Sequence, residues 1–484
     1  MERLKSCCAS VWRRCAVLAP LAVAATLTGC AVGPDYERPS FTHQEQWNSE
    51  LKMTTELAES ALARWWQRFD DPVLDALVTQ ATSYNGDLAV ALANIERARS
   101  LRRMESSTLY PSLAAEAGVE RNRFSSQSSS ARSSGVRNTF DASLDAAWEL
   151  DIFGRARRSV EAAEARLQAA VEIKRDVVVS MIAELAGSYF QLRGLQRRIA
   201  VTRLNIALLQ EVEGLAQAQF EAGVVSEFDV ARARGEREAI EALLPNLEAE
   251  MMAQIYRISV LTGQPPEYHV GILEASEPLP MPPDQVPVGL RSDLLKRRPD
   301  ILQAERELAA SVASIGIAKA DLFPSLSLTG AVGSSARLFS DLFTANTLTY
   351  SLGSTIKWSV FEWGKRLANV EVAEAEAKAA LAAYEQAVLL ALEDAESALI
   401  RYGKEWQTLS RLRDAEVTRK DAFEIAKLRY EVGEENFLVI LDADRALINV
   451  RNDIIQSETR ILTSLTQVYK ALGGGWQQLE GSID

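Results

Sequence analysis

A strand that runs directly into a long helix constrains the fold of this chain more than any other feature. Between residues 348 and 360 apolar and polar side chains alternate, with Leu352 and Trp358 on the apolar side. This two-residue period is typical of a β-strand. From Lys365 onward apolar residues recur every three or four positions among many Ala and Glu residues, which predicts an α-helix. The period changes at one glycine, Gly364, so we expect a strand and a helix joined without a loop.

The same strand-to-helix junction occurs earlier in the chain. The residues that match at a spacing of 210 are Phe140 with Tyr350, Trp148 with Trp358, Gly154 with Gly364, Gly223 with Gly433, and Gly263 with Gly473. Pro111 and Pro324 also correspond, at a spacing of 213. A fixed spacing across tryptophans and glycines indicates an internal duplication. The two spacings differ by three residues, and this difference is confined to the segment between each proline and the junction that follows it.

The first thirty residues are typical of an export signal. Basic residues precede an apolar stretch at positions 16–28, and the signal ends in the sequence LeuThrGlyCys at 27–30. This ending resembles the bacterial lipobox, so we expect Cys30 to become the first mature residue and to carry an S-diacylglycerol and an N-acyl (palmitate) group. An ordinary signal peptide is the alternative. Ala31 is not the Asp that tends to retain lipoproteins in the inner membrane, which favours export to the outer membrane.

Composition excludes several classes of protein. The formal net charge is −13, and removing residues 1–29, with four basic residues and one acidic residue, leaves about −16. A strongly acidic chain is a poor nucleic-acid binder. All four cysteines lie at or before position 30, so the mature chain has no disulfide available. No apolar run of about 20 residues occurs after the signal, so no membrane-spanning helix is expected.

We divide the chain into six parts. The predicted boundaries are 1–29 for the signal peptide, 30–71 for an extended lead with its lipid anchor, 72–264 for the first repeat, 265–298 for a proline-rich crossover, 299–476 for the second repeat and 477–484 for a polar tail.

The predicted strands cover 113–124, 138–152, 325–333 and 347–360. The predicted helices cover 72–83, 86–109, 155–220, a return through 261 that Pro245 kinks, 299–322, 365–430 and a last helix ending at 472. The helix at 155–220 would be about 100 Å long, and Gly223 is expected to end it in a tight left-handed turn.

Each half therefore offers two strands, of about the length that crosses an outer membrane. Four strands cannot close, and an unpaired strand edge in lipid costs several kcal/mol per backbone group. Several copies must therefore share one barrel. Two copies give eight strands around a filled interior, and three give twelve strands with room for a water-filled lumen; we expect three. The long helices would continue this barrel as a tube, with a solid coiled-coil rod as the alternative.

Several motifs together make a family resemblance specific. They are the lipobox followed by ValGlyProAspTyrGluArgPro, two ProSerLeu sites, the junctions at Gly154 and Gly364, ArgTyrGluValGly at 429–433 and TyrLysAlaLeuGlyGlyGlyTrp at 469–476. With them, essentially the whole mature chain resembles the outer membrane efflux protein family, which includes TolC, and within it the lipid-anchored OprM- and NodT-type channels. The resemblance implies an α+β membrane protein of a Gram-negative outer membrane. A trimeric 12-stranded transmembrane β-barrel, with four strands per chain, would continue into a long periplasmic α-helical barrel.

The same resemblance implies partners and site residues. It implies a homotrimer in outer-membrane lipid that meets a periplasmic adaptor protein and an inner-membrane pump of the resistance-nodulation-division class. Gly223 and Gly433 match the periplasmic tip that docks to the adaptor. Asp442 matches the acidic residue that constricts the tip, and Asp229 lies at the corresponding height on the first hairpin. Val439 stands where TolC has a second acidic residue, which argues against a two-ring gate.

The function implied is a passive exit duct of a tripartite efflux system for drugs or other small toxic compounds. A duct for a type I secretion system and a periplasm-spanning structural lipoprotein without a pore are the alternatives. We expect no enzyme activity and no cofactor other than the lipid. The only histidines, His43 and His269, are not in metal-ligand spacings, and neither a phosphate-binding loop nor a nucleophile elbow is present.

Overall fold

The computed structural model describes residues 31–40, 47, 62–124, 135–283, 288–289, 291–432, 434–435 and 437–477. The chain forms two compact units, and each draws on both halves of the sequence. The first unit falls within residues 1–39, 95–169 and 304–384, and the second within 40–94, 170–303 and 385–484. Cys30 and Gly433, two predicted site residues, lie outside the described part of the chain.

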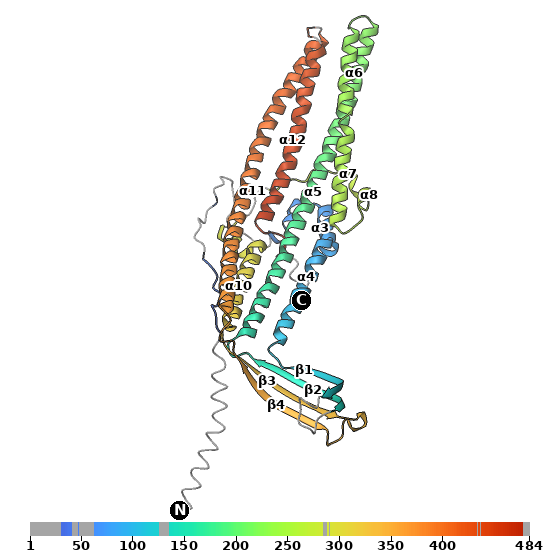
Figure 1. Ribbon diagram of the computed structural model, residues 1–484. Helices are drawn as coiled ribbons and strands as arrows, with labels where there is room; N and C mark the ends of the chain where they lie inside the picture. Colours follow the sequence, from blue (N-terminus) through green and yellow to red (C-terminus); the bar gives the residue numbers. More distant parts are fainter. Residues whose placement is uncertain are drawn as a thin grey trace, which may run out of the picture. The chain divides into compact units, whose positions relative to one another are not determined.

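The first unit contains one antiparallel sheet whose strands follow each other in chain order (Figure 1). The strands are β1 (Ser112–Phe124), β2 (Gly135–Leu150), β3 (Ser325–Ala336) and β4 (Leu348–Lys357), and a 3₁₀ turn, η2 (Phe339–Asp341), lies between the last two. All four predicted strands are present. β4 ends three residues before the predicted position 360, and the next residue, Trp358, donates a side-chain hydrogen bond to the carbonyl of Leu322 (3.1 Å).

Four helices have residues in both units. They are α4 (Gly86–Ser107), α5 (Arg155–Glu221), α10 (Pro299–Ala320) and α11 (Lys365–Glu431). The two long helices α5 and α11 have 67 residues each, close to the predicted bounds and equivalent to about 100 Å of helix. No helix in the described residues combines the length and the apolar character needed to cross a bilayer.

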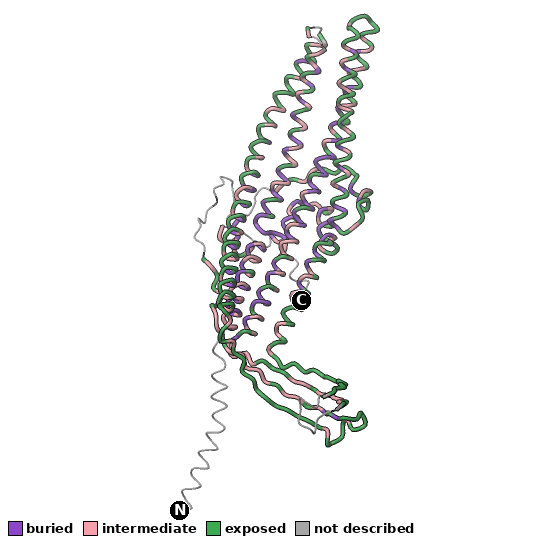
Figure 2. Tube along the Cα trace, in the orientation of Figure 1, coloured by how far each residue is buried: buried purple, intermediate pink, exposed green. Residues whose placement is uncertain are grey.

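The second unit contains η1 (Trp65–Phe69), α3 (Pro72–Tyr84), α6 (Glu227–Glu241), α7 (Leu244–Leu261), α8 (Val270–Leu273), α9 (Arg291–Arg297) and α12 (Phe437–Ala471). Its core lies where η1, α3, α5, α7 and α12 pack together, and Trp65 at its centre stacks on Tyr469 with ring centroids 4.8 Å apart. Figure 2 shows that the buried residues are concentrated on the helices, whereas the edge strands β1 and β4 are exposed and the inner strands β2 and β3 are mostly intermediate.

The return of the first hairpin is two helices rather than one kinked helix. α6 ends at Glu241 and α7 starts at Leu244, with Pro245 in the first turn of α7. Proline has no backbone N–H, and its ring clashes with the carbonyl four residues earlier, so it fits a helix start better than a helix interior. The prediction of one kinked helix was therefore wrong, because a short break separates α6 from α7.

The proline-rich crossover also contains two short helices, α8 and α9, that its composition did not predict. α9 ends at Arg297, and the next residue, Arg298, stands before Pro299. The ring of a proline disfavours helical backbone angles at the residue before it, so the break between α9 and α10 falls at Arg298.

A buried histidine next to α8 predicts a pH dependence of stability. His269 is 4% exposed, its Nε2 lies 3.0 Å from Oγ1 of Thr262, and burial lowers its pKa below the ordinary value. The fold therefore favours neutral His269, so this stabilisation is complete above the unfolded pKa of about 6.5 and is lost as the pH falls through the folded value. We expect His269→Gln to reduce the fall in melting temperature between pH 7 and pH 5. An equal fall in melting temperature between pH 7 and pH 5 in the wild type and the variant would contradict this prediction.

Candidate functional site

The register of the four strands separates apolar from polar side chains. One row across the sheet contains Ala115, Leu144, Val332 and Tyr350, and the next row contains Glu116, Ser143, Gly333 and Thr349. Because neighbouring rows point to opposite faces, one face is apolar and the other polar. On the apolar face, Leu352 and Tyr350 of β4 are 89% and 86% exposed. A sheet with these two faces is suited to lipid on one side and water on the other.

The two outer edges of this sheet are open within the described chain. β1 pairs only with β2, and β4 pairs only with β3, so the outward backbone groups of both edge strands have no strand partner. Such groups are tolerated in water but cost several kcal/mol each in hydrocarbon. The edges can be satisfied together if β4 of one chain pairs with β1 of another.

The two predicted strand-to-helix junctions share the conformation of their glycines. Gly154 and Gly364 have backbone φ angles of +86° and +80°, a region that favours glycine. The carbonyl oxygen of each glycine accepts the first hydrogen bond of the following helix, at 2.8 Å and 2.9 Å. Both helices start directly after these glycines, but the expected connection without a loop was wrong, because residues 151–154 separate β2 from α5 and residues 358–364 separate β4 from α11.

Each junction is also held by a tryptophan. Nε1 of Trp148 donates to the carbonyl of Leu109, and Nε1 of Trp358 donates to the carbonyl of Leu322, both at 3.1 Å. The two tryptophans are 210 residues apart, like the glycines of the two junctions. The two acceptor residues are 213 residues apart, like Pro111 and Pro324. The same contact thus fixes the strand against the end of the preceding helix in both halves.

The turn at the end of α5 has the predicted form. Gly223 has φ +74°, its N–H donates to the carbonyl of Phe220, and the N–H of Val224 donates to that of Gln219, both at 2.9 Å. These two bonds define a Schellman ending, which requires a left-handed residue. In the second hairpin the N–H of Glu434 donates to the carbonyl of Arg429, also at 2.9 Å and 210 residues further on.

Asp229, predicted at the tip, caps α6. Its Oδ2 accepts hydrogen bonds from the backbone N–H and the hydroxyl of Ser226, at 3.0 Å and 2.8 Å. The bond from the Ser226 N–H is one of the two bonds of a capping box, and both bonds to Oδ2 lower the pKa of Asp229, with the hydroxyl bond as the largest cause. The carboxylate therefore has a structural role in starting the helix after the turn.

Asp442 lies near the start of α12 with its side chain 67% exposed. Its nearest cation is Arg232 of α6, 3.6 Å away, and the next turn of α12 contributes Arg445, whose Nε donates to Glu236 of α6 at 2.9 Å. α6 and α12 are thus joined at this end by partly exposed charge pairs, and such pairs individually contribute about 1 kcal/mol or less. The exposure of Asp442 leaves its charge available to solvent.

Sequence reasoning missed Asp444, two residues further along α12. Asp444 is 7% exposed because it falls in the buried stripe of the helix with Leu441, Leu447 and Val450. Burial raises its pKa to about 6, against the opposing effect of Arg451. A charged residue within an apolar stripe at helical spacing was the signal that could have identified it.

The N-terminal segment, residues 31–39, is bound to α5 and α10 of the first unit. The sequence predicted only an extended lead here. Arg158 of α5, whose side chain is 6% exposed, donates to Asp35 at 2.7 Å and to the carbonyls of Val32 and Gly33 at 3.4 Å. The buried carboxylate of Glu305 in α10 accepts from the hydroxyl of Tyr36 at 3.1 Å, and it also pairs with Arg38 (3.0 Å). This segment directly follows the predicted lipid-bearing Cys30.

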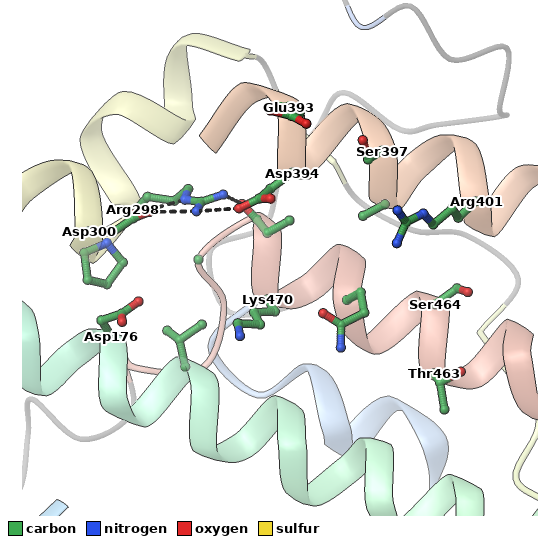
Figure 3. Close-up of a pocket in the computed structure, with 16 residues that line it drawn as sticks. Asp176, Arg298, Asp300, Glu393, Asp394, Ser397, Arg401, Thr463, Ser464 and Lys470 are labelled. Atoms are coloured by element: carbon green, nitrogen blue, oxygen red, sulfur yellow. Dashed lines mark hydrogen bonds and ion pairs between the residues drawn. The ribbon is translucent and has the colours of Figure 1, made fainter. Parts of the chain in front are cut away.

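A polar cavity of about 540 Å³ lies in the second unit between α5, α11, α12 and the start of α10 (Figure 3). Arg298 bridges Asp300 (2.7 Å) and Asp394 (3.2 Å) and donates to the carbonyls of Ala391 and Ala471, both at 3.2 Å. These contacts tie the chain before α10 to α11 and α12. Among the described residues no group of three or more His, Cys, Asp or Glu side chains is placed to hold a metal ion.

Comparisons with known proteins agree with this geometry. The sequence model of the outer membrane efflux protein family matches residues 77–264 and 290–474. The toluene efflux pump outer membrane protein TtgC of Pseudomonas putida is 31% identical over 476 residues, which cover 96% of this chain and 97% of TtgC. The antibiotic efflux pump outer membrane protein ArpC of Pseudomonas putida has the same identity and coverage. Nodulation protein T of Rhizobium leguminosarum bv. trifolii is 31% identical over 87% of this chain and 89% of its own length.

Two solved structures give the same result for the fold. The outer-membrane channel OprN superposes with a TM-score of 0.86 at 37% identity, covering 93% of this chain and all of OprN. The open state of the MtrE outer membrane channel of Neisseria gonorrhoeae superposes with a TM-score of 0.80 at 28% identity, covering 93% of this chain and 99% of MtrE. The chain therefore belongs to the outer membrane efflux protein family and is an outer-membrane exit channel for efflux.

Proposed function

We propose that three copies of this chain pool their strands into a 12-stranded barrel whose lumen continues through a barrel of the long helices. The observation that carries this proposal is a sheet with one apolar face and two open edges. Three copies are favoured over two because eight strands leave an interior that side chains fill, whereas twelve leave a water-filled lumen. The repeated glycine and tryptophan contacts support an origin of the two halves by duplication.

The substrates proposed are small toxic compounds, including solvents and antibiotics. The support is that relatives with 31% identity are named as toluene and antibiotic efflux components. The duct would be passive and would receive its cargo from an inner-membrane pump of the resistance-nodulation-division class through a periplasmic adaptor. Deletion of the gene is expected to raise susceptibility to solvents and antibiotics, and expression of the chain should restore resistance. Unchanged susceptibility in a strain where the cognate pump is active would contradict the proposal.

The proposed site of lipid attachment is Cys30, which directly precedes the segment that contacts the junction at Gly154. The support is the neighbouring N-terminal segment, whose Val32 N–H donates to the carbonyl of Phe153 at 3.1 Å, directly before Gly154. A Cβ atom on Gly154 would lie 2.7 Å from the Cα of Ala31, so the segment and the junction are in close contact. An acyl group on Cys30 would then enter the membrane at the base of the barrel strands.

The turns at Gly223 and Gly433 are the proposed docking site for the adaptor. No atom lies within 4 Å of a Cβ built on Gly223, but its φ of +74° disfavours a side chain there. Replacing Gly223 and Gly433 by valine should therefore distort the turns and abolish efflux while trimers still form. Gly235→Ala in α6, also with open space around its Cβ, is the matched control and should retain efflux. Retained efflux by the valine variant would reject the docking role.

Asp442 is the proposed gate residue at the tip, with Asp229 of the capping box at the corresponding position of the first hairpin. Three copies of Asp442 around one axis would narrow the lumen with their side chains, attract cations and resist anions, and alanine would remove the side chains that narrow it. We expect Asp442→Ala to raise the conductance of the reconstituted channel severalfold, with a smaller effect at high salt because of screening. Asp453→Ala, an exposed acid on the same helix, is the control and should leave conductance unchanged. Equal conductance of wild type and Asp442→Ala, with normal assembly, would remove the gate assignment.

A further inference from the structure

A second cavity, of about 380 Å³, lies between α5, α11 and α12 of the second unit. Its walls are mainly apolar and are formed by Val201, Leu204, Leu208, Ile448, Ile454 and Ile455. Its volume is in the range of cavities that hold small organic ligands. The cavity is separate from the predicted gate, because Asp442 does not line it.

Two hydrogen-bond acceptors in this cavity have no donor among the described residues. Asn205 of α5 is 7% exposed, and its buried Oδ1 has no hydrogen-bond partner. Asp444 of α12 is also 7% exposed, and among the described residues its carboxylate has electrostatic neighbours but no hydrogen bond, although it is not fully shielded from solvent as Oδ1 of Asn205 is. A buried acceptor without a donor destabilises the fold, and more so when it is charged. Both side chains line the same cavity, so one ligand can satisfy both.

The basic side chains of this cavity are already paired with other acids. Arg197 of α5 pairs with Glu458, and Nε of Arg451 donates to Glu416 of α11 at 3.1 Å. Arg451 still attracts Asp444 electrostatically, without a hydrogen bond, and Glu236 of α6 repels it. Asp444 is therefore the one carboxylate of the described cavity lining without an ion-pair partner at hydrogen-bond distance.

We propose that this cavity binds organic ammonium ions that have an apolar body. The ammonium group would donate to the Asp444 carboxylate and to Oδ1 of Asn205, and the apolar body would pack on the Val, Leu and Ile side chains. Charge-assisted hydrogen bonds to a desolvated carboxylate are the strongest ones available to such a site. This inference rests on the proposed efflux function and specifies cationic amphiphiles as a substrate class that contacts the duct before it leaves.

Binding of a cation is expected to be linked to the protonation of Asp444. Burial raises the pKa of Asp444 to about 6, and an ammonium ion beside the carboxylate would lower it again. Affinity should therefore be nearly constant above pH 7 and should fall as the pH drops through 6. At pH 6 binding should release protons, which calorimetry in two buffers of different ionisation enthalpy measures.

The probe for this proposal is 1-naphthylmethylammonium, titrated by fluorescence into the purified full-length protein in detergent. The nearly isosteric anion 1-naphthaleneacetate is the matched control ligand, and detergent alone corrects for partition into micelles. We expect saturable binding of the cation and none of the anion. Asp444→Asn should weaken binding at least tenfold, and Asn205→Leu should weaken it severalfold. Asp453→Asn removes an exposed carboxylate from the same helix and should bind like the wild type.

Equal affinity of the wild type and Asp444→Asn, or equal binding of the cation and the anion, would overturn the proposal. Both variants are nearly isosteric, and their assembly is checked by size-exclusion chromatography. If the wild type supports efflux in cells but binds no 1-naphthylmethylammonium, this inference fails and the proposed function stands. If the wild type does not support efflux, the proposed function fails independently of the titration.

Discussion

Replacing Leu352 with arginine is expected to prevent stable insertion of the protein into the outer membrane. Leu352 is in the middle of β4 on the apolar face, 89% exposed in the single chain, opposite Gly330 of β3. An arginine on the lipid face of a barrel costs about 2–4 kcal/mol near the bilayer midplane. Three copies would each carry this cost. The measurement is the fraction of protein recovered as folded, heat-modifiable trimer in the outer-membrane fraction.

The neighbouring residue provides the control at the same depth. Ser351 is on the polar face, opposite Ala331, so Ser351→Arg should place its charge in water and leave insertion nearly normal. Equal recovery of both variants would mean that the apolar face does not contact lipid. Equal loss of both would mean that β4 tolerates no long side chain on either face.

Gly33→Val is expected to release the N-terminal segment from α5 and α10. Gly33 has φ +104°, and a Cβ on it would overlap the backbone of Gly316 in α10. Without the segment, Arg158 loses Asp35 and two carbonyl acceptors, and buried Glu305 loses Tyr36 and Arg38. Arg158 keeps Glu161 and Glu305 keeps Arg306, so the expected cost is that of the lost hydrogen bonds, about 1–3 kcal/mol, seen as release and a lower melting temperature.

Limited proteolysis with chymotrypsin measures this release. Cleavage after Tyr36, identified from the mass of the N-terminal fragment, should be slow in the wild type and fast in Gly33→Val. Gly187→Ala in α5, where a Cβ meets no atom within 4 Å, should behave like the wild type. Equally fast cleavage in the wild type would show that the segment is not held. Equally slow cleavage in Gly33→Val would show that Gly33 is not required to hold it.

Much of the fold could be predicted because two periods dominate the sequence. The alternation around Leu352 and the helical stripe after Lys365 each repeat over many residues, so strands, long helices and their junctions follow from pattern alone. The glycines at 154, 223 and 364 were identifiable because a turn or junction there needs a positive φ. The spacing of 210 then extended each assignment from one half to the other.

The remaining features depend on contacts that local sequence does not encode. The segment at 31–39 has no periodicity, and its order comes from Arg158 and Glu305, more than 100 residues away. The helices α8 and α9 are short and lie among prolines, so propensity gives no signal for them. Asp442 and Asp444 differ in sequence position by two residues, but only the fold shows that one is exposed and the other buried.

The central claim is that open strand edges from separate chains close into one shared barrel. Native mass spectrometry of the purified, acylated protein in mild detergent tests it most directly. A single species with the mass of three chains is the predicted result. A stable lone chain, in detergent and after reconstitution into liposomes, would contradict the shared barrel and with it the conduit.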